Sequence, residues 1–139
     1  MLRTIRLEIP GIPVGKARPR FTKKGHAYTP EKTREYEGRV AAAFYDSREK
    51  AFQKGTPIFV DVIARMPIPK STSKKKRLEM LAREPEEMLK KPDIDNIVKA
   101  VLDGLSGLAF PDDDQVWKIY AYKIYAEEPS TTVLISGDE

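Results

Sequence analysis

The stretch Lys91-Pro92-Asp93-Ile94-Asp95-Asn96-Ile97-Val98-Lys99-Ala100-Val101-Leu102-Asp103 is the most informative part of the chain, because its apolar and polar side chains separate onto two sides of one predicted helix. At about 100° per residue, the apolar side chains form a single stripe. The stripe consists of Ile94, Ile97, Val98, Val101, Leu102 and Leu105. The opposite side of the helix carries Asp95, Asn96, Lys99 and Asp103. We therefore predict an amphipathic helix from about Asp93 to Leu108.

Four segments around this helix have the patterns of β-strands. Residues 2–9 alternate between apolar and polar side chains, with the period of two that is typical of a strand. Residues 58–66 are apolar on both faces, which predicts a central strand. Residues 115–125 and 131–135 are rich in β-branched and aromatic side chains and flank a predicted turn at 127–130. The C-terminal part of the chain therefore predicts two strands connected by a turn.

A second helix and a basic insert complete the predicted elements. We expect the helix to begin with Thr29 as the N-cap and Pro30 as the first helical residue, and to run to about Gln53 before Gly55. The lysine-rich insert at residues 70–91, broken by Pro85, predicts a short exposed helix or a flap. The order β, α, β, insert, α, β, β predicts a single mixed α/β (α+β) domain over residues 1–139. Its mixed sheet would contain antiparallel pairs and pack against the helices.

Composition excludes several classes of protein. A chain of 139 residues is expected to form one domain. It has no cysteine, so disulfides, thiolate zinc sites and cysteine nucleophiles are excluded, and its one histidine, His26, excludes a two-histidine metal site within one chain. No apolar stretch approaches the roughly 20 residues of a membrane span, and the start has no apolar block of signal-peptide type. We expect a cytoplasmic protein with no membrane partner.

Charge is distributed unevenly along the chain. The net charge is only +4, but residues 1–34 carry nine Lys and Arg against two acids, and residues 92–139 carry three against ten. A basic front and an acidic back suit a protein that grips a polyanion and also holds cations. Solvated surfaces also produce such runs by chance, so the distribution alone does not decide between these interpretations.

The acidic back contains a second cluster, Asp112-Asp113-Asp114, between Pro111 and the strand that follows. Three successive carboxylates repel one another, and a turn needs only one. If this turn folded back beside Asp93 and Asp95, it would assemble three or more carboxylates, the hard oxygen ligands that Mg²⁺ prefers. The alternative is a capped amphipathic helix with an Asp95-Lys99-Asp103 ladder, in which each pair contributes about 0.2–0.5 kcal/mol.

The basic front gathers cations and aromatic side chains in one segment rich in proline and glycine. Arginine forks suit phosphate oxygens, and neighbouring aromatic rings could stack on an unpaired base. The alternative is a solubilising loop with Phe21 tucked into the core. The candidate DNA-binding residues are Lys16, Arg18, Arg20, Lys23, Lys24 and Tyr28.

Together these motifs resemble the RusA-type Holliday-junction resolvases, particularly phage or prophage-like members. Asp93-x-Asp95-Asn96-x-x-Lys99-x-x-x-Asp103-x-Leu105, followed by Asp112-Asp113-x-Gln115-Val116, is similar to the signature of that family. The front, Pro13-x-Gly15-Lys16-x-Arg18-Pro19-Arg20 and then Tyr28-Thr29-Pro30, is similar to its phage-type members. The resemblance covers most of the chain.

The resemblance implies a homodimer that acts on four-way DNA junctions with Mg²⁺, or Mn²⁺ in its place. By position, Asp93, Asp95 and Asp113 match the metal-binding and catalytic aspartates, and Lys99 matches the catalytic lysine. The residues expected to support them are Asn96, Asp103 and Asp112.

The expected function is structure-selective endonuclease activity that resolves four-way junctions by paired phosphodiester hydrolysis in DNA recombination and repair. The metal would polarise the phosphate and lower the pKa of an attacking water, and Lys99 would stabilise the developing charge or help to position the water. Two other functions stay open at this point: a Mg²⁺-dependent nuclease acting on other branched DNA or on RNA, and a non-catalytic DNA-binding module.

Overall fold

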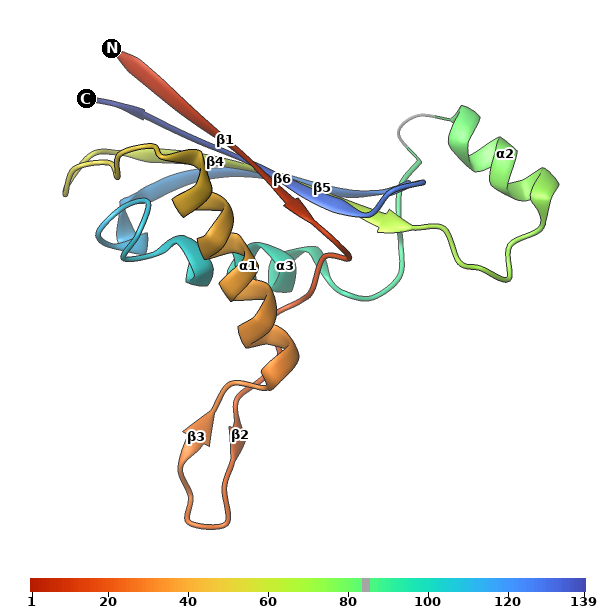
Figure 1. The fold of residues 1–139 in the computed structure, drawn as a ribbon, viewed down its shortest axis with the longest axis horizontal. Coiled ribbons are helices and arrows are strands. Elements are labelled where there is room, and N and C mark those ends of the chain that lie inside the picture. Colours follow the sequence, from red (N-terminus) through yellow and green to blue (C-terminus); the bar gives the residue numbers. More distant parts are fainter. Residues whose placement is uncertain (84–85) are drawn as a thin grey trace.

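A four-stranded mixed sheet forms the centre of the computed structural model, which describes residues 1–83 and 86–139 (Figure 1). The strand order is β1–β6–β4–β5, with β6 antiparallel to both β1 and β4, and β4 parallel to β5. The strands are β1 (Leu2–Pro10), β4 (Ile58–Pro67), β5 (Val116–Ala126) and β6 (Ser130–Asp138). The predicted mixed sheet with antiparallel pairs is confirmed, and the strand at residues 58–66 is central as predicted.

Helices α1 (Glu31–Ser47) and α3 (Ile94–Leu105) pack on the same face of this sheet (Figure 1). The apolar stripe of α3 is buried there at Ile97, Val101 and Leu105, as its periodicity predicts. Alternate side chains of β4 point toward the same helices. Burial of the apolar faces of α3 and β4 against each other therefore stabilises the packing of the helices on the sheet. The fully buried side chains of β4 are Ile58, Val60, Val62 and Ala64. No helix in the described part of the chain has the length and apolarity needed to cross a membrane.

Helix α1 begins and ends at other residues than predicted. Pro30 occupies the N-cap position, and its carbonyl oxygen accepts hydrogen bonds from the backbone N–H groups of Thr33 and Arg34, so the predicted Thr29 cap is wrong. The helix ends at Ser47 because Arg48 adopts a left-handed conformation with φ of 58°. The chain then turns to bury Phe52, whose backbone N–H donates to the Ala109 carbonyl at 2.7 Å. Tertiary burial therefore overrides continuation of the helix.

Helix α3 also ends earlier than predicted, at Leu105 instead of Leu108. The backbone of Ser106 is extended, and the N–H groups of Leu108 and Ala109 both donate to the Leu105 carbonyl, at 2.9 Å each. This turn places Phe110 in the core with no exposed surface. The helix stops where another apolar side chain must turn inward.

The basic insert contains the exposed helix α2 (Lys74–Ala82), which extends from the end of the sheet (Figure 1). The Ser73 hydroxyl accepts a hydrogen bond from the backbone N–H of Lys76, and Met80 is the buried residue of the helix. The predicted short exposed helix is therefore confirmed, while the predicted break at Pro85 lies outside the described residues. Beyond it, the Met88 N–H donates to the Lys123 carbonyl at 3.2 Å, which attaches the insert to the last part of β5.

A small hairpin of β2 (Arg20–Phe21) and β3 (Ala27–Tyr28) projects away from the two layers (Figure 1). Its turn is closed by the Thr22 N–H donating to the His26 carbonyl at 2.9 Å, with Gly25 at a φ of 81°. We expected one irregular loop through Tyr28, and this prediction is wrong for the hairpin: two-residue strands have no measurable periodicity in the sequence. We call residues 18–28 the basic arm.

Candidate functional site

Asp93 and Asp95 lie at the start of α3 with their carboxylates accessible to solvent. Asp93 occupies the N-cap position, but its side chain makes no capping hydrogen bond; its Oδ2 lies 3.0 Å from the Lys91 ammonium, and its side chain is 47% exposed. Asp95 is exposed and forms no ion pair within the described residues. Neither carboxylate is consumed in holding the helix together, so both are available to a ligand.

Lys99 lies one helical turn beyond Asp95 and is also exposed. Within the described residues it forms no ion pair with Asp95 or with Asp103. The Asp103 carboxylate instead contacts the Lys16 ammonium, 3.0 Å from Oδ2. The alternative interpretation of this helix as an Asp-Lys-Asp ladder is therefore wrong for this structure. The Lys99 ammonium remains free to meet an anionic substrate.

Lys16 is a structural residue rather than the exposed DNA contact that we predicted. Its Nζ donates to the Glu37 carboxylate at 2.6 Å and also contacts Asp103, and its side chain is only 16% exposed. Burial by itself lowers the pKa of Lys16, but the hydrogen bonds and negative charges of the two carboxylates outweigh it and raise the pKa above its ordinary value. This side chain joins the front loop to α1 and α3, so it is not available to phosphates.

The front loop lies directly against the first turn of α3. The backbone N–H of Lys16 donates to the Asn96 carbonyl at 2.8 Å. A Cβ on Gly15 would lie 2.9 Å from the Pro92 Cβ and 3.2 Å from the Asn96 Cβ, so only glycine permits this approach. Asn96 therefore anchors the front loop through its backbone carbonyl. The family-like sequence contained Gly15, but local pattern could not show that it contacts α3.

The basic arm carries the remaining predicted DNA-binding residues, all of them exposed. Its base is fixed by the Lys16–Asn96 hydrogen bond and by the Ala17 N–H, which donates to the Thr33 hydroxyl at 3.3 Å. No ion pair within residues 1–83 and 86–139 involves the cations of the arm. The residues that the structure brings together here are Arg18, Arg20, Lys23, Lys24 and Tyr28. The arm therefore presents uncompensated positive charge, and its base lies beside the start of α3.

The second acidic cluster forms a short 3₁₀ turn, η1 (Asp113–Gln115), immediately before β5. The Asp112 carboxylate accepts a hydrogen bond from the backbone N–H of Asp114 at 3.2 Å, and the Asp112 N–H donates to Gln115 Oε1 at 3.1 Å. Gln115 in turn donates to the carbonyls of Gln53 and Thr56. Asp112 thus shapes the turn, while Asp113 is exposed on its surface. Sequence reasoning missed the structural role of Gln115.

The two acidic clusters lie at opposite ends of the fold. The start of α3 is tied to the last part of β5, because the Lys123 ammonium donates to the Pro92 carbonyl at 2.9 Å and to the Lys90 carbonyl at 2.6 Å. Asp113 precedes the first residue of β5, and the strand from Val116 to Lys123 spans about 23 Å at 3.3 Å per residue. Figure 1 shows α3 and β5 running in opposite directions, with the turn between them at the far end.

One chain therefore does not assemble the predicted carboxylate cluster. Among the residues that the structure describes, no three acidic or histidine side chains are grouped closely enough to hold a metal ion. Our expectation that the Asp112-Asp113-Asp114 turn folds back beside Asp93 and Asp95 is wrong for the single chain. The physical reason is the direction of α3: its start and the start of β5 are separated by the length of the strand.

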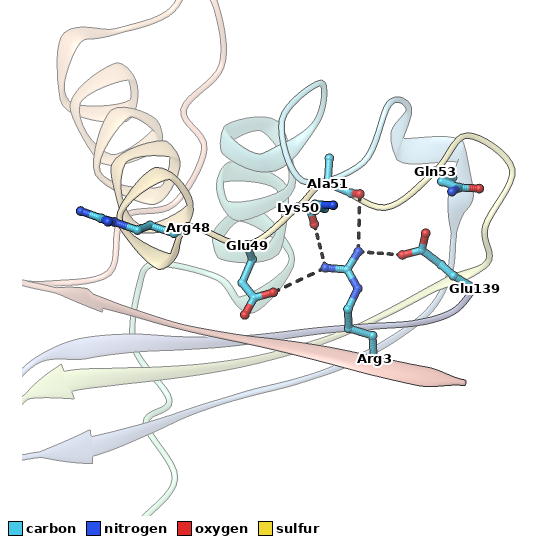
Figure 2. A pocket seen from close by; sticks show the side chains of 7 residues that line it. All are labelled: Arg3, Arg48, Glu49, Lys50, Ala51, Gln53 and Glu139. Carbon is cyan, nitrogen blue, oxygen red and sulfur yellow. Dashed lines mark hydrogen bonds and ion pairs between the residues drawn. The ribbon is translucent and has the colours of Figure 1, made fainter.

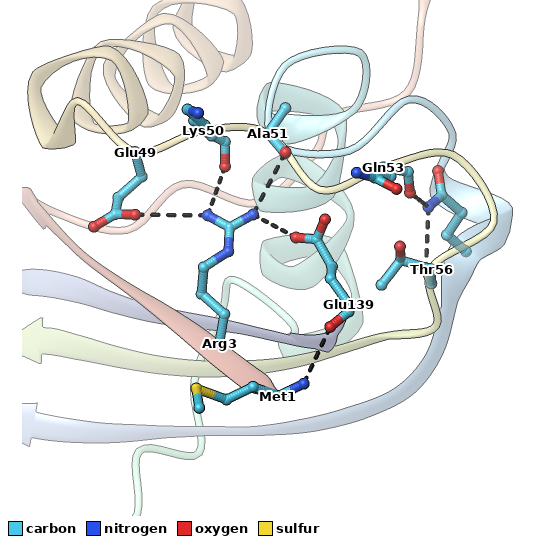
Figure 3. A network of polar contacts seen from close by, with 9 residues as sticks. Met1, Arg3, Glu49, Lys50, Ala51, Gln53, Thr56 and Glu139 are labelled. Atoms are coloured by element: carbon cyan, nitrogen blue, oxygen red, sulfur yellow. Dashed lines mark hydrogen bonds and ion pairs between the residues drawn. The ribbon is translucent and has the colours of Figure 1, made fainter.

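A polar hollow at the opposite end of the sheet is a structural cluster. The Arg3 guanidinium donates to the carbonyls of Lys50 and Ala51 and to the Glu139 carboxylate, and it pairs with Glu49 at 3.6 Å (Figure 2). The network continues to the chain start, where the Met1 ammonium donates to the Glu139 carbonyl at 3.1 Å (Figure 3). Both carboxylates share the one Arg3 guanidinium, so this cluster ties the ends of the chain to the segment after α1.

The comparisons with known proteins bear on this arrangement. The family model described as "Endodeoxyribonuclease RusA" matches residues 10–136. The chain belongs to the RusA endodeoxyribonuclease family. This match confirms the resemblance and places the chain in a family of DNA endonucleases. The chain is also similar to the "Uncharacterized protein YqaN" of Bacillus subtilis (strain 168), with 36% identity over 135 residues and 94% of each chain covered.

Proposed function

We propose that this RusA-family chain is a Mg²⁺-dependent endonuclease that resolves four-way DNA junctions as a two-fold homodimer. The observation that carries the proposal is the contact between the base of the basic arm and the first turn of α3, at 2.8 Å from the Lys16 N–H to the Asn96 carbonyl. A phosphate backbone held by the arm therefore passes close to Asp93 and Asp95. Cations that attract DNA and carboxylates that hold a metal are located together.

The donor set fits a hard cation. Asp93 and Asp95 supply carboxylate oxygens, and the chain has no cysteine and only His26, which lies in the turn of the arm. Oxygen ligands favour Mg²⁺, with Mn²⁺ as a substitute. When bound, the metal neutralises charge on the phosphate and makes an attacking water more acidic. One chain contributes only part of the ligand set, so we infer that Asp113 is supplied by a second chain.

The protein side chains have separate roles in this proposal. Asp93 and Asp95 would hold the cation, and the exposed Lys99 ammonium, one turn from Asp95, would neutralise charge that develops on the phosphate. The Lys91 ammonium lies 3.0 Å from the Asp93 carboxylate and would supply a further positive charge beside the phosphate. Asn96, Gly15 and the Lys16 ion pairs keep the arm in position and do not touch the substrate.

A two-fold axis through the middle of β5 would complete the site. Such an axis exchanges the ends of the strand, and so brings Asp113 of one protomer toward Asp93 and Asp95 of the other. The symmetric dimer then contains two equivalent sites, as paired cuts across a two-fold symmetric junction require. This arrangement also explains why the two acidic motifs lie at opposite ends of one chain.

The surface around β5 has the composition of such an interface. Three of its side chains are large and exposed: Trp117 is 68% exposed, Tyr120 61% and Ile119 45%. Trp117 also lines an apolar hollow with Leu2 and Phe59. Aromatic side chains are enriched where proteins associate, and large apolar groups gain free energy when a partner removes them from water. A second copy of the chain is the partner that also supplies the missing carboxylate.

The proposed activity is tested by comparing a four-way junction with a linear duplex of matched sequence, with and without Mg²⁺. We expect paired, symmetric cuts in the junction, little cutting of the duplex, and none when the metal is chelated. Equal cutting of junction and duplex would contradict junction selectivity. Metal-dependent cutting confined to flaps or RNA would favour the broader nuclease function, and binding without any cutting would identify a DNA-binding module.

The shared site is tested by mixing two inactive variants. In a mixed dimer of Asp95→Asn and Asp113→Asn chains, both lesions fall in one site and the other site is intact. Exchange of protomers should therefore restore cutting of one strand per mixed dimer. If the dimers mix at random, about half of them are mixed and each has one intact site, so about a quarter of all sites are active. If each chain held a complete site of its own, every site would carry a lesion and mixing would restore nothing. Each variant refolded with itself is the control.

A further inference from the structure

Phe21 is an aromatic side chain that the fold leaves unused. It is 69% exposed, although it belongs to β2 and has no apolar layer beneath it. In the hairpin register it lies opposite Ala27, while Arg20 lies opposite Tyr28. Because successive side chains of a strand point to opposite faces, one face of the arm carries Phe21 and Ala27 and the other Arg20 and Tyr28. Within the paired part of the hairpin, the face with Phe21 therefore carries no charge and the opposite face carries a cation.

The ring of Phe21 is free of competing contacts. Within the described residues it takes part in no aromatic pair and no cation–π contact. Our sequence alternative, in which Phe21 is tucked into the core, is wrong. The arm is held in shape by its own turn, where the His26 N–H donates to the Thr22 hydroxyl at 3.1 Å. A single exposed apolar residue is ordinary on a protein surface, but this one is carried outward on a projecting hairpin.

The charge of the arm identifies the kind of partner. The segment 16–30 contains no aspartate or glutamate, while Arg18, Lys23 and Lys24 are exposed cations on the arm. Arg20 lines a hollow at the base of the arm together with Lys32 and Pro92, near the start of α3. Such a surface attracts a polyanion and repels the same arm of a second copy. An exposed aromatic ring among phosphate-binding cations fits the flat face of a nucleobase.

We propose that Phe21 is a wedge residue that stacks on an unstacked base at the branch point of a junction. The proposal rests on the proposed action on branched DNA and adds the feature by which the arm distinguishes a branch from a duplex. Cations on the arm contact any phosphate backbone and carry no preference for structure. The Phe21 ring has no partner in a continuous stack of paired bases, whereas a branch point exposes one. Selectivity for the branch therefore comes from stacking, and affinity for DNA from charge.

The test measures binding in the absence of divalent metal, so that no cleavage occurs. The probes are a four-way junction with 2-aminopurine at the branch point, a linear duplex of the same sequence, and a duplex with one unpaired 2-aminopurine. Replacing Phe21 with alanine should weaken junction binding about tenfold, within the range measured for loss of one base–aromatic stack. Duplex binding and the dependence of affinity on salt should stay at wild-type values, because no phosphate contact is lost.

Matched variants separate stacking from other effects. Phe21→Trp should keep junction affinity and the 2-aminopurine response, whereas Phe21→Leu should lose most of both, because leucine is apolar but has no aromatic face. Tyr45 lies near the far end of α1 and its side chain is similarly exposed, at 65%. Tyr45→Ala should leave junction affinity and the 2-aminopurine response unchanged. Arg20→Ala should weaken binding to both junction and duplex and reduce the salt slope by about one.

Three results would overturn the wedge. Wild-type junction affinity and fluorescence response in Phe21→Ala would show that the ring contacts no base. An equal loss on junction and duplex would show that Phe21 only shapes the arm. A lower melting temperature or an altered oligomeric state would show that the ring packs against protein. Failure of the proposed nuclease function is distinguishable, because a protein that never cuts junctions could still give a Phe21-dependent response with the unpaired base.

Discussion

At the scale of single residues, Lys16 shows how one ion pair positions a loop. Its ammonium lies between Glu37 on α1 and Asp103 on α3, at 2.6 and 3.0 Å. Replacing it with methionine leaves two partly buried carboxylates without a cation. We expect Lys16→Met to lower the free energy of unfolding by about 1–3 kcal/mol at pH 7, between the values for exposed and buried ion pairs. Lys24→Met, on the exposed arm, is the control and should have no effect in denaturant unfolding.

The same residue predicts a specific pH dependence. Because the pKa of Lys16 is raised in the folded chain, its contribution is fully present below its ordinary value of 10.5 and is lost as the pH rises toward the folded value. Burial also raises the pKa of Tyr36, so the folded chain loses further stability as the pH rises. This loss is equal in wild type and in Lys16→Met, and it cancels in the comparison. The gap in unfolding free energy between wild type and Lys16→Met should therefore narrow above about pH 10.5. A gap that stays constant up to pH 12 would contradict the ion-pair assignment.

The Asp95 carboxylate separates catalysis from stability. It forms no ion pair in the described chain, so Asp95→Asn should leave the metal-free melting temperature equal or higher, because clustered acids in the assembled site repel one another. Loss of a hard ligand should reduce Mg²⁺-dependent junction cleavage by about a thousandfold or more, with junction binding retained. Asp114→Asn, an exposed carboxylate outside the proposed site, should cleave normally. Near wild-type cleavage by Asp95→Asn would show that the site is elsewhere.

At the scale of elements, the contact between α1 and α3 orients the helix that carries Asp93, Asp95 and Lys99. Gly104 permits the close approach, since a Cβ there would lie 2.9 Å from the Glu37 carbonyl oxygen and 2.9 Å from the Val40 Cβ. The backbone of α1 cannot move aside without disturbing its own packing on the sheet. The geometry of the candidate site therefore depends on one small residue in the helix interior.

A matched pair of glycine variants tests this contact. Gly104→Ala should lower the free energy of unfolding by about 1–3 kcal/mol through overpacking. Gly38→Ala, on the exposed side of α1 with no atom within 4 Å of the new Cβ, should raise it by about 0.5–1 kcal/mol through helix propensity. Chemical denaturation of both variants gives the comparison. The two changes in unfolding free energy must have opposite signs. Two changes of the same sign would show that helix propensity, and not packing, determines the effect of the substitution at Gly104.

At the scale of the whole molecule, the proposed dimer links the apolar β5 surface to catalysis. Trp117→Lys should raise the dimer dissociation constant about tenfold or more, because it places a charge in the core of the interface. Junction cleavage should fall at the same protein concentrations at which sedimentation shows dissociation. Leu78→Lys, on α2 and 65% exposed, is the control and should leave both unchanged. A monomer that cuts junctions at the full rate would contradict the shared site.

Much of the fold could be predicted from local pattern. The stripe from Ile97 to Leu105 predicted α3 and its buried face, and alternation or continuous apolarity located β1 and the central β4. These signals are local, because side-chain burial repeats every two residues in a strand and every 3.6 in a helix. The ends of α1 and α3 were less predictable, since burial of Phe52 and Phe110 decides where each helix stops, and that depends on residues distant in the sequence.

The residue types proposed for the site can be read from the sequence: carboxylates at Asp93, Asp95 and Asp113, a lysine at position 99, and cations with aromatic rings at the front. Where these groups lie relative to one another depends on the tertiary structure. It turned Lys16 inward to two carboxylates, carried Phe21 outward on a hairpin, and placed Asp113 a strand's length from Asp93. The physical reason is that residue types follow from the sequence, whereas distances between them follow from the direction in which α3 packs against β5.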